Sequence, residues 1–118
     1  MSLHHKLCHV LGGAFGLPHA ETHTVILPHA VAYNAAGAPV AIGRVARALG
    51  TGHAAQGLFD LAVANGGPKS LREIGMSYSD LDWAAEAAVQ SPYWNPRSIE
   101  RNAIRKLLDD AYNGRRPA

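Results

Sequence analysis

Histidines crowd the amino-terminal part of this sequence, where six of the seven lie within the first 29 residues. His5 and His9 are four positions apart, and so are His19 and His23. Because residues four apart in an α-helix share one face, each pair can point its two imidazoles in the same direction. Imidazole is the commonest metal ligand in proteins and the side chain whose charge changes near neutral pH. The spacing therefore indicates a site for a metal ion or for proton transfer.

Two short helices joined by a turn would position these pairs. A Gly-Gly pair and a Gly-Leu-Pro turn signal separate them. We predict one helix over residues 3–15 and a second over residues 18–33, because Pro18 suits the first turn of a helix, where its missing N–H is not needed. Pro28 would remove a hydrogen bond inside the second helix, so we expect a bend or break at residues 24–27. Such a helix pair can aim its imidazoles at one point.

The rest of the chain also follows the helical period, and no segment alternates as a strand would. We predict further helices over residues 39–49, 53–65, 81–89 and 98–112, with a short helical turn at 70–74. The last helix carries an apolar stripe of Ile99, Ala103, Ile104, Leu107, Leu108 and Ala111. Because 118 residues can bury one core but not two, we expect a single all-α domain, a helical bundle, over residues 1–118.

The composition indicates a globular protein without a nucleic-acid or membrane partner. With 17% charged residues and a net charge of +2, the sequence has no basic stripe. No apolar run reaches the roughly 20 residues of a membrane helix, and the amino terminus lacks the apolar core of a signal peptide. We therefore expect a soluble, cytoplasmic protein. The one cysteine, Cys8, excludes an internal disulfide. We expect it to be a small buried residue, with a thiolate ligand as the alternative.

Four segments carry a resemblance to a known family. The run from His5 to Asn34 reads HKLCHVLGGAFGLPHAETHTVILPHAVAYN. It resembles the histidine-rich signature of the iron-containing (group III) alcohol dehydrogenases and, within them, of the maleylacetate reductases. The segments RVARALG from Arg44, PYWNPR from Pro92 and LLDDAYNG from Leu107 are similar to the carboxyl-terminal region of that family. The resemblance thus covers essentially the whole chain.

The resemblance implies a domain assignment. In these enzymes, as in the related dehydroquinate synthase-like proteins, a nucleotide-binding α/β domain precedes an all-helical domain. The chain is similar to most of the second domain, and no segment of it resembles the phosphate-binding loop of the first. We expect a C-terminal domain that lacks the nucleotide-binding domain.

Roles for individual histidines follow from the same resemblance. His5 and His19 correspond to the two histidines that this domain gives to a divalent metal, iron or zinc, whose other two ligands precede residue 1. His9 matches the histidine that faces the nicotinamide and the substrate, so it is the one cofactor contact expected in this chain. In a metal-independent alternative, His9 and His19 orient the substrate or relay a proton, and both are candidate catalytic residues.

The reaction implied is the reduction of maleylacetate, a small dicarboxylate, to 3-oxoadipate with NADH or NADPH, during the degradation of aromatic compounds. His23 is a candidate substrate contact, because it lies one helical turn beyond His19 and can reach the same cleft. The remaining histidines are expected to carry no chemistry: His4 at the surface, His29 as a hydrogen-bonded structural residue and His53 at a helix start.

Two other classes of function stay open on the sequence. One is a non-catalytic helical module that persists as an oligomer, and the other is a small, independent metalloenzyme that uses the same histidines. If the interface with a nucleotide domain is uncovered, residues 12–18 and the helix from His19 would present an apolar, histidine-bearing face. We therefore expect a homo-oligomer, most simply a two-fold dimer.

Overall fold

The computed structural model describes residues 2–35, 37–90, 93, 95 and 97–117, and every regular element in these residues is a helix. The elements are α1 Ser2–Phe15, α2 His19–Asn34, α3 Pro39–Ala48, α4 Ala54–Ala64, the 3-10 turn η1 Tyr78–Asp80, α5 Leu81–Gln90 and α6 Arg101–Asn113. The predicted all-α class is confirmed. None of the described helices is both long and apolar enough to cross a membrane.

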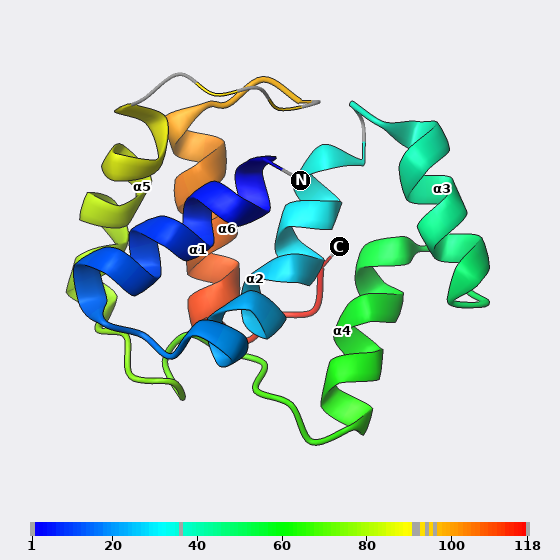
Figure 1. Cartoon of the computed structure of the whole chain (residues 1–118), viewed down its shortest axis with the longest axis horizontal. Helices are drawn as coiled ribbons and strands as arrows, with labels where there is room; N and C mark the ends of the chain where they lie inside the picture. Colours follow the sequence, from blue (N-terminus) through cyan, green and yellow to red (C-terminus); the bar gives the residue numbers. More distant parts are fainter. Residues whose placement is uncertain (1, 36, 91–92, 94, 96, 118) are drawn as a thin grey trace.

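Helices α1, α2, α5 and α6 surround the main core, and α3 and α4 pack as a pair beside α2 (Figure 1). On α1, Leu3, Leu7 and Leu11 recur at every fourth position and are completely buried. The stripe predicted on α6 supplies Ile104 and Leu108, which are also completely buried. This helical periodicity places one face of each helix inside and leaves the opposite face to carry polar groups.

Helix α2 is central because it packs against both groups of helices. Val25 and Ile26 belong to the main core, whereas Val31 belongs to a smaller core shared with α3 and α4. Of the bend or break expected at residues 24–27, the break is wrong, because the helix runs without interruption from His19 to Asn34, and the bend stays a prediction. Pro28 is buried. We attribute the continuity to packing on several sides of α2, which offsets the hydrogen bond that the proline removes.

The segment predicted as a short turn at 70–74 is a hydrogen-bonded turn, and its Leu71 N–H donates to the carbonyl of Ala111 on α6 at 2.9 Å. Glu73 Oε1 accepts from the N–H of Ser70 at 2.8 Å, which fixes the start of this turn. The last helix begins at Arg101, three residues later than expected. The apolar stripe of the last helix thus starts before the helix itself does.

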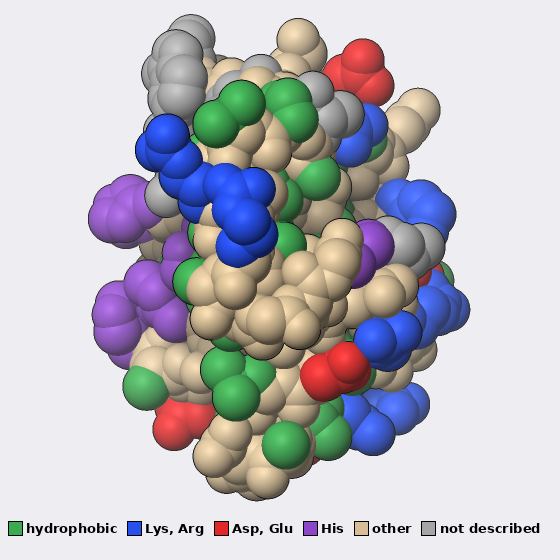
Figure 2. Space-filling model, turned by 90° about the vertical axis from the view of Figure 1, so that its right-hand side faces the viewer, with side chains coloured by type: hydrophobic (Ala, Val, Ile, Leu, Met, Phe, Trp, Pro, Cys, Tyr) green, Lys and Arg blue, Asp and Glu red, His purple; other side chains and the backbone are tan. Residues whose placement is uncertain are grey.

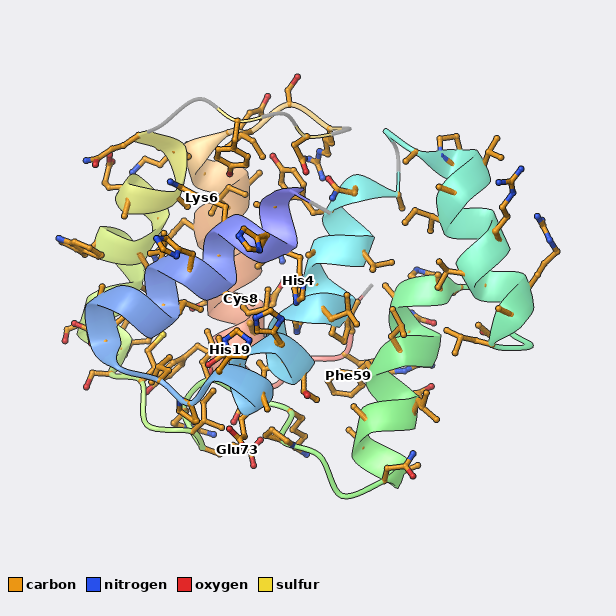
Figure 3. The ribbon with its side chains drawn as sticks, viewed as in Figure 1. His4, Lys6, Cys8, His19, Phe59 and Glu73 are labelled. Atoms are coloured by element: carbon orange, nitrogen blue, oxygen red, sulfur yellow. The ribbon has the colours of Figure 1, made fainter. Side chains whose placement is uncertain are left out.

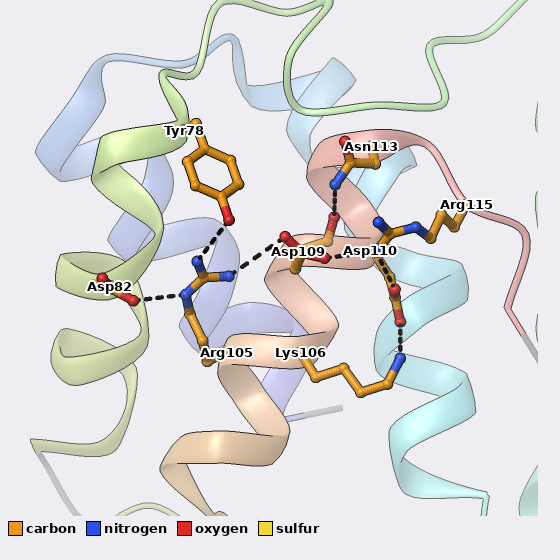
Figure 4. A network of polar contacts seen from close by, with 8 residues as sticks. All are labelled: Tyr78, Asp82, Arg105, Lys106, Asp109, Asp110, Asn113 and Arg115. Atoms are coloured by element: carbon orange, nitrogen blue, oxygen red, sulfur yellow. Dashed lines mark hydrogen bonds and ion pairs between the residues drawn. The ribbon is translucent and has the colours of Figure 1, made fainter.

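Helix α6 is tied to α5 and η1 through Arg105, as Figure 4 shows. Its Nε donates to Asp82 Oδ1 on α5 at 2.7 Å, and its Nη2 lies 3.5 Å from the hydroxyl of Tyr78. Asp82 is largely exposed, so this ion pair adds little to the stability of the fold.

Candidate functional site: a histidine-lined pocket between α1 and α2

A pocket of about 450 Å³ opens between α1 and α2. It is lined by His5, Cys8, His9, Gly12, Gly13, Leu17, His19, Thr22 and His23. Both predicted histidine pairs therefore meet at one place, as the four-residue spacing indicated. Figure 2 shows histidine side chains gathered along one edge of the molecule.

The turn between the two helices sets the position of the pocket. Gly16 adopts a left-handed conformation with φ +64°, which favours glycine, and its N–H donates to the carbonyl of Gly12 at 3.1 Å. Pro18 then precedes α2, and its carbonyl accepts from both the N–H and the hydroxyl of Thr22. Leu17 is buried between these two ends. The chain thus reverses tightly and lays the first turns of α2 against α1.

The imidazoles of the pocket differ in exposure. His5, His9 and His19 are exposed, whereas His23 is half-buried. Burial is the main cause that lowers the pKa of His23 below its usual value, and the charges of His19 and His5 lower it further. His23 is therefore neutral near pH 7. A neutral imidazole has one nitrogen that can accept a proton or bind a metal ion.

His4 lies at the seam where α1 and α2 pack together beside the pocket. The expectation that it lies at the surface is therefore wrong. It is half-buried, and its Nε2 lies 3.2 Å from the carbonyl oxygen of His23. The two rings stand edge to face, with 4.8 Å between their centroids. The first turn of α1 passes close to α2, so a side chain that points away from His5 still meets the neighbouring helix. Figure 3 shows His4 and Cys8 on α1 and His19 on α2 along this seam.

Cys8 is 6% exposed, and burial raises the pKa of its thiol to about 12. The expectation of a small buried residue is confirmed. One ligand atom from each of His4, Cys8 and His23 lies within 4.8 Å of the other two. Sequence reasoning missed this cluster. The signal was present, because His4 and Cys8 have the same four-residue spacing that singled out His5 and His9.

The other two histidines lie elsewhere. His53 is the N-cap of α4, and its Nδ1 accepts from the N–H of Gln56 at 3.3 Å, so the expected helix-start position is confirmed. His29 is 4% exposed, but its Nε2 makes no hydrogen bond with any residue that the structure describes. The expectation of a satisfied histidine is therefore wrong at this atom. Burial lowers the pKa of His29 to about 4.

Comparison with known proteins identifies the family. The model of the Fe-containing alcohol dehydrogenase family, C-terminal, matches residues 1–112. The chain belongs to the iron-containing alcohol dehydrogenase family. All four pocket histidines and the seam with His4 and Cys8 lie within the matched residues. This agrees with the resemblance carried by the run from His5 to Asn34.

Similar proteins within this family are maleylacetate reductases. The chain is 61% identical over 118 residues to the maleylacetate reductase of Burkholderia cepacia, covering all of this chain and 34% of the relative. It is 56% identical over 117 residues to that of Pseudomonas sp. strain P51, covering 33% of the relative. The chain thus spans about a third of the length of the curated relatives it matches.

Solved structures of the family have the same fold. The crystal structure of maleylacetate reductase from Agrobacterium tumefaciens has a TM-score of 0.95 at 54% identity, over 99% of this chain and 33% of that one. The structure of 1,3-propanediol oxidoreductase has a TM-score of 0.82 at 28% identity, over 93% of this chain and 32% of that one. The helical arrangement is therefore preserved at lower sequence identity.

The family name implies iron, and the pocket fits part of an iron site. His5 and His19, the expected ligands, both line the pocket with exposed imidazoles. The described residues of its lining include no carboxylate, although carboxylate is a usual partner of imidazole around Fe²⁺. The donor set of this pocket is thus incomplete, and any remaining ligands must come from beyond its lining residues.

Proposed function

We propose that this chain forms the histidine-bearing wall of the active site of a maleylacetate reductase-like, NAD(P)H-dependent oxidoreductase. The observation that carries the proposal is the meeting of His5, His9, His19 and His23 in one pocket between two helices. The names of the relatives support it, since proteins 50–61% identical to the chain are maleylacetate reductases. Residues 1–118 act as one helical domain, and the residues that bind the nucleotide lie outside it.

His9 and His19 are the catalytic residues of the proposal. Both imidazoles are exposed at the pocket, where they can reach a bound keto acid. A bound nicotinamide would supply hydride to a conjugated carbon of maleylacetate, which would leave negative charge on the keto oxygen. An imidazole that donates a hydrogen bond to this oxygen stabilises that charge and can then deliver a proton. His9 is also the residue placed to face the nicotinamide of NADH or NADPH.

His23 binds the dicarboxylate substrate from the deeper side of the pocket. Because it stays neutral near pH 7, it offers one hydrogen-bond donor without adding a full charge. In a metal-containing enzyme, His5 and His19 would hold iron or zinc, which polarises a substrate oxygen as a Lewis acid. His9 would keep its proton-relay role in either case, because it is not one of the two proposed ligands.

We also propose that the protein works in the cytoplasm as a homo-oligomer. Near the expected interface at residues 12–18, Leu17 is buried, but Phe15 packs edge to face on Trp83 of α5, with centroids 5.5 Å apart, and Trp83 is 56% exposed. Large apolar side chains are also exposed on α3 and α4, at Val40 and Leu61. Light scattering over a range of protein concentrations tests the association.

A chimera tests the proposed function. The part of the Burkholderia cepacia maleylacetate reductase that precedes the matched segment is joined to this chain, which is 61% identical to the segment it replaces. We expect NADH oxidation that depends on maleylacetate. A chimera with helical content and a cooperative melt but no such activity would contradict the proposal.

The 118-residue chain alone is the matched control. It should not oxidise NADH with maleylacetate, because hydride transfer needs the nicotinamide held within near-attack distance of the substrate. Turnover by the chain alone would contradict the placement of the nucleotide-binding residues outside it.

A further inference from the structure

A second set of possible metal ligands lies beside the proposed catalytic histidines. His4 and Cys8 share one face of α1, and His23 approaches them from α2. Their ligand atoms all lie within 4.8 Å of one another. This is the one group of three or more histidine, cysteine or acidic side chains with such spacing that the described residues contain.

The separations between these ligand atoms are close to those found around a bound metal ion. Around tetrahedral Zn²⁺, with bonds of about 2.3 Å to sulfur and 2.0–2.1 Å to nitrogen, neighbouring ligand atoms are roughly 3.3–3.6 Å apart. The three atoms of the cluster therefore need to close by about 1 Å, which small rotations of two half-buried imidazoles can supply. The backbone is already fixed, because Leu3, Leu7 and Leu11 anchor α1 in the core.

We propose that His4, Cys8 and His23 form a binding site for a thiophilic divalent cation such as Zn²⁺, separate from the pair His5 and His19. Two imidazoles and one thiolate are the donor types that select zinc over magnesium or calcium. Two of the three ligands, Cys8 and His23, also line the pocket. The fourth coordination position therefore opens into the pocket, as in zinc sites that keep one position for water or substrate.

Binding at this site exchanges a proton for the metal ion. Near pH 7, Cys8 is a thiol, since its pKa is raised to about 12. Coordination breaks the S–H bond, forms the Zn–S bond and releases one proton to solvent, with no change in oxidation state. His4 and His23 each bind the ion through a ring nitrogen that carries no proton.

Cobalt substitution of the purified 118-residue chain provides the test. Co²⁺ bound by Cys8 should give a thiolate-to-cobalt charge-transfer band and the intense visible bands of a tetrahedral site, saturating at one ion per chain. Added Zn²⁺ should abolish both sets of bands by displacement. Because this readout needs neither NADH nor maleylacetate, its outcome is independent of the proposed reductase function.

Four variants locate the site. Cys8→Ala should abolish the charge-transfer band, and His23→Gln should weaken Zn²⁺ binding by at least about tenfold. His53→Asn, at the N-cap of α4 and outside the pocket lining, is the control and should leave the band and the affinity unchanged. His5→Asn removes the imidazole next to His4 and tests whether the ion is held by the His5 and His19 pair instead. Circular dichroism shows whether each variant is folded, and His23→Gln remains informative if Cys8→Ala unfolds, because His23 is half-buried.

Three results would overturn the proposal. The first is Co²⁺ binding without a charge-transfer band, which would place the metal away from Cys8. The second is a loss of binding in His5→Asn as large as that in His23→Gln, which would assign the ion to the His5 and His19 pair. The third is an absence of saturable binding.

Discussion

The imidazoles of His19 and His23, one helical turn apart on α2, are in contact, with 4.1 Å between ring centroids and a tilt of 47°. His23 in turn meets the ring of His4, so three imidazoles form a continuous row across the seam between α1 and α2. At such separations a positive charge on one ring disfavours a charge on the next. A charge on His19 therefore disfavours a charge on His23 and helps to hold the pKa of His23 below its usual value.

Replacing His19 should raise the pKa of His23. Burial is the larger cause of the lowered value, and His19 is the next. The variant His19→Asn removes only the second cause, so we expect the pKa of His23 to move part of the way back toward 6.5. A titration of the histidine ring signals by nuclear magnetic resonance measures it. His9→Asn, which removes an imidazole of α1 from the same pocket, is the control. An unchanged His23 titration in His19→Asn would contradict the coupling.

His29 should make the fold sensitive to acid. Burial is the main cause that lowers its pKa to about 4, so between pH 6.5 and 4 the unfolded chain binds a proton that the folded chain does not. Stability is thus fully present above pH 6.5 and falls as the pH drops toward 4, by about 3 kcal/mol from this group. In His29→Leu this part of the loss should disappear.

Urea unfolding of both proteins at several pH values between 7 and 4 measures this difference. Carboxylates contribute equally to both proteins, so the comparison isolates the histidine. His29→Leu should not be strongly destabilised at pH 7, because the Nε2 it removes has no partner among the described residues. Identical pH profiles for the two proteins would refute the assignment.

The hydroxyl of Tyr33 should stabilise the packing of α2 against the segment that leads into α6. It donates to the carbonyl of Ser98 at 2.5 Å and accepts from the N–H of Glu100 at 3.2 Å. We expect Tyr33→Phe to lower the free energy of unfolding by about 1–3 kcal/mol, because it leaves both backbone groups without this partner. Tyr78→Phe is the control, since Tyr78 is 56% exposed and should change stability by less than about 0.5 kcal/mol. Equal effects of the two substitutions in urea unfolding would contradict this role.

Gly114 and Gly50 provide a matched pair of left-handed glycines. Their φ angles are +68° and +70°, so an alanine in this left-handed conformation should destabilise the fold by about 1–2 kcal/mol at either position. A Cβ at Gly114 would also lie 3.2 Å from the Cβ of Ser70, whereas nothing lies within 4 Å at Gly50. Gly114→Ala should therefore lower the melting temperature more than Gly50→Ala. The reverse order would show that Ser70 can move away from the added Cβ without lowering the stability of the fold.

Much of the fold could be predicted because each helix carries its own signals. Gly50 and Gly114 follow the ends predicted for α3 and α6, and the stripe ending at Leu108 and Ala111 defines the buried face of α6. The break at Pro28 was wrong, because packing on several sides of α2 is a tertiary effect that no local rule contains. Local patterns describe one helix, whereas its neighbours decide whether a proline is tolerated.

In the candidate site, too, the local spacing could be predicted from the sequence and the contacts between helices could not. The spacing of His5 with His9 and of His19 with His23 was enough to predict that the pairs line one place. The position of His4 was not predictable in the same way, because it depends on how closely α2 approaches the first turn of α1. A helical wheel gives the direction of a side chain but not the identity of the helix that lies in that direction.

The catalytic role of the histidine pocket is tested most directly in the chimera with the Burkholderia cepacia enzyme. The substitution His9→Asn or His19→Asn is introduced into the chimera, and kcat/KM for maleylacetate is measured. Each substitution should lower kcat/KM by about 100-fold or more, the usual contribution of a general acid or base. His53→Asn, at the N-cap of α4 and outside the pocket lining, should leave kcat/KM unchanged. If His9→Asn and His19→Asn retain the kcat/KM of the unsubstituted chimera, the histidine pocket is not the catalytic wall of this domain.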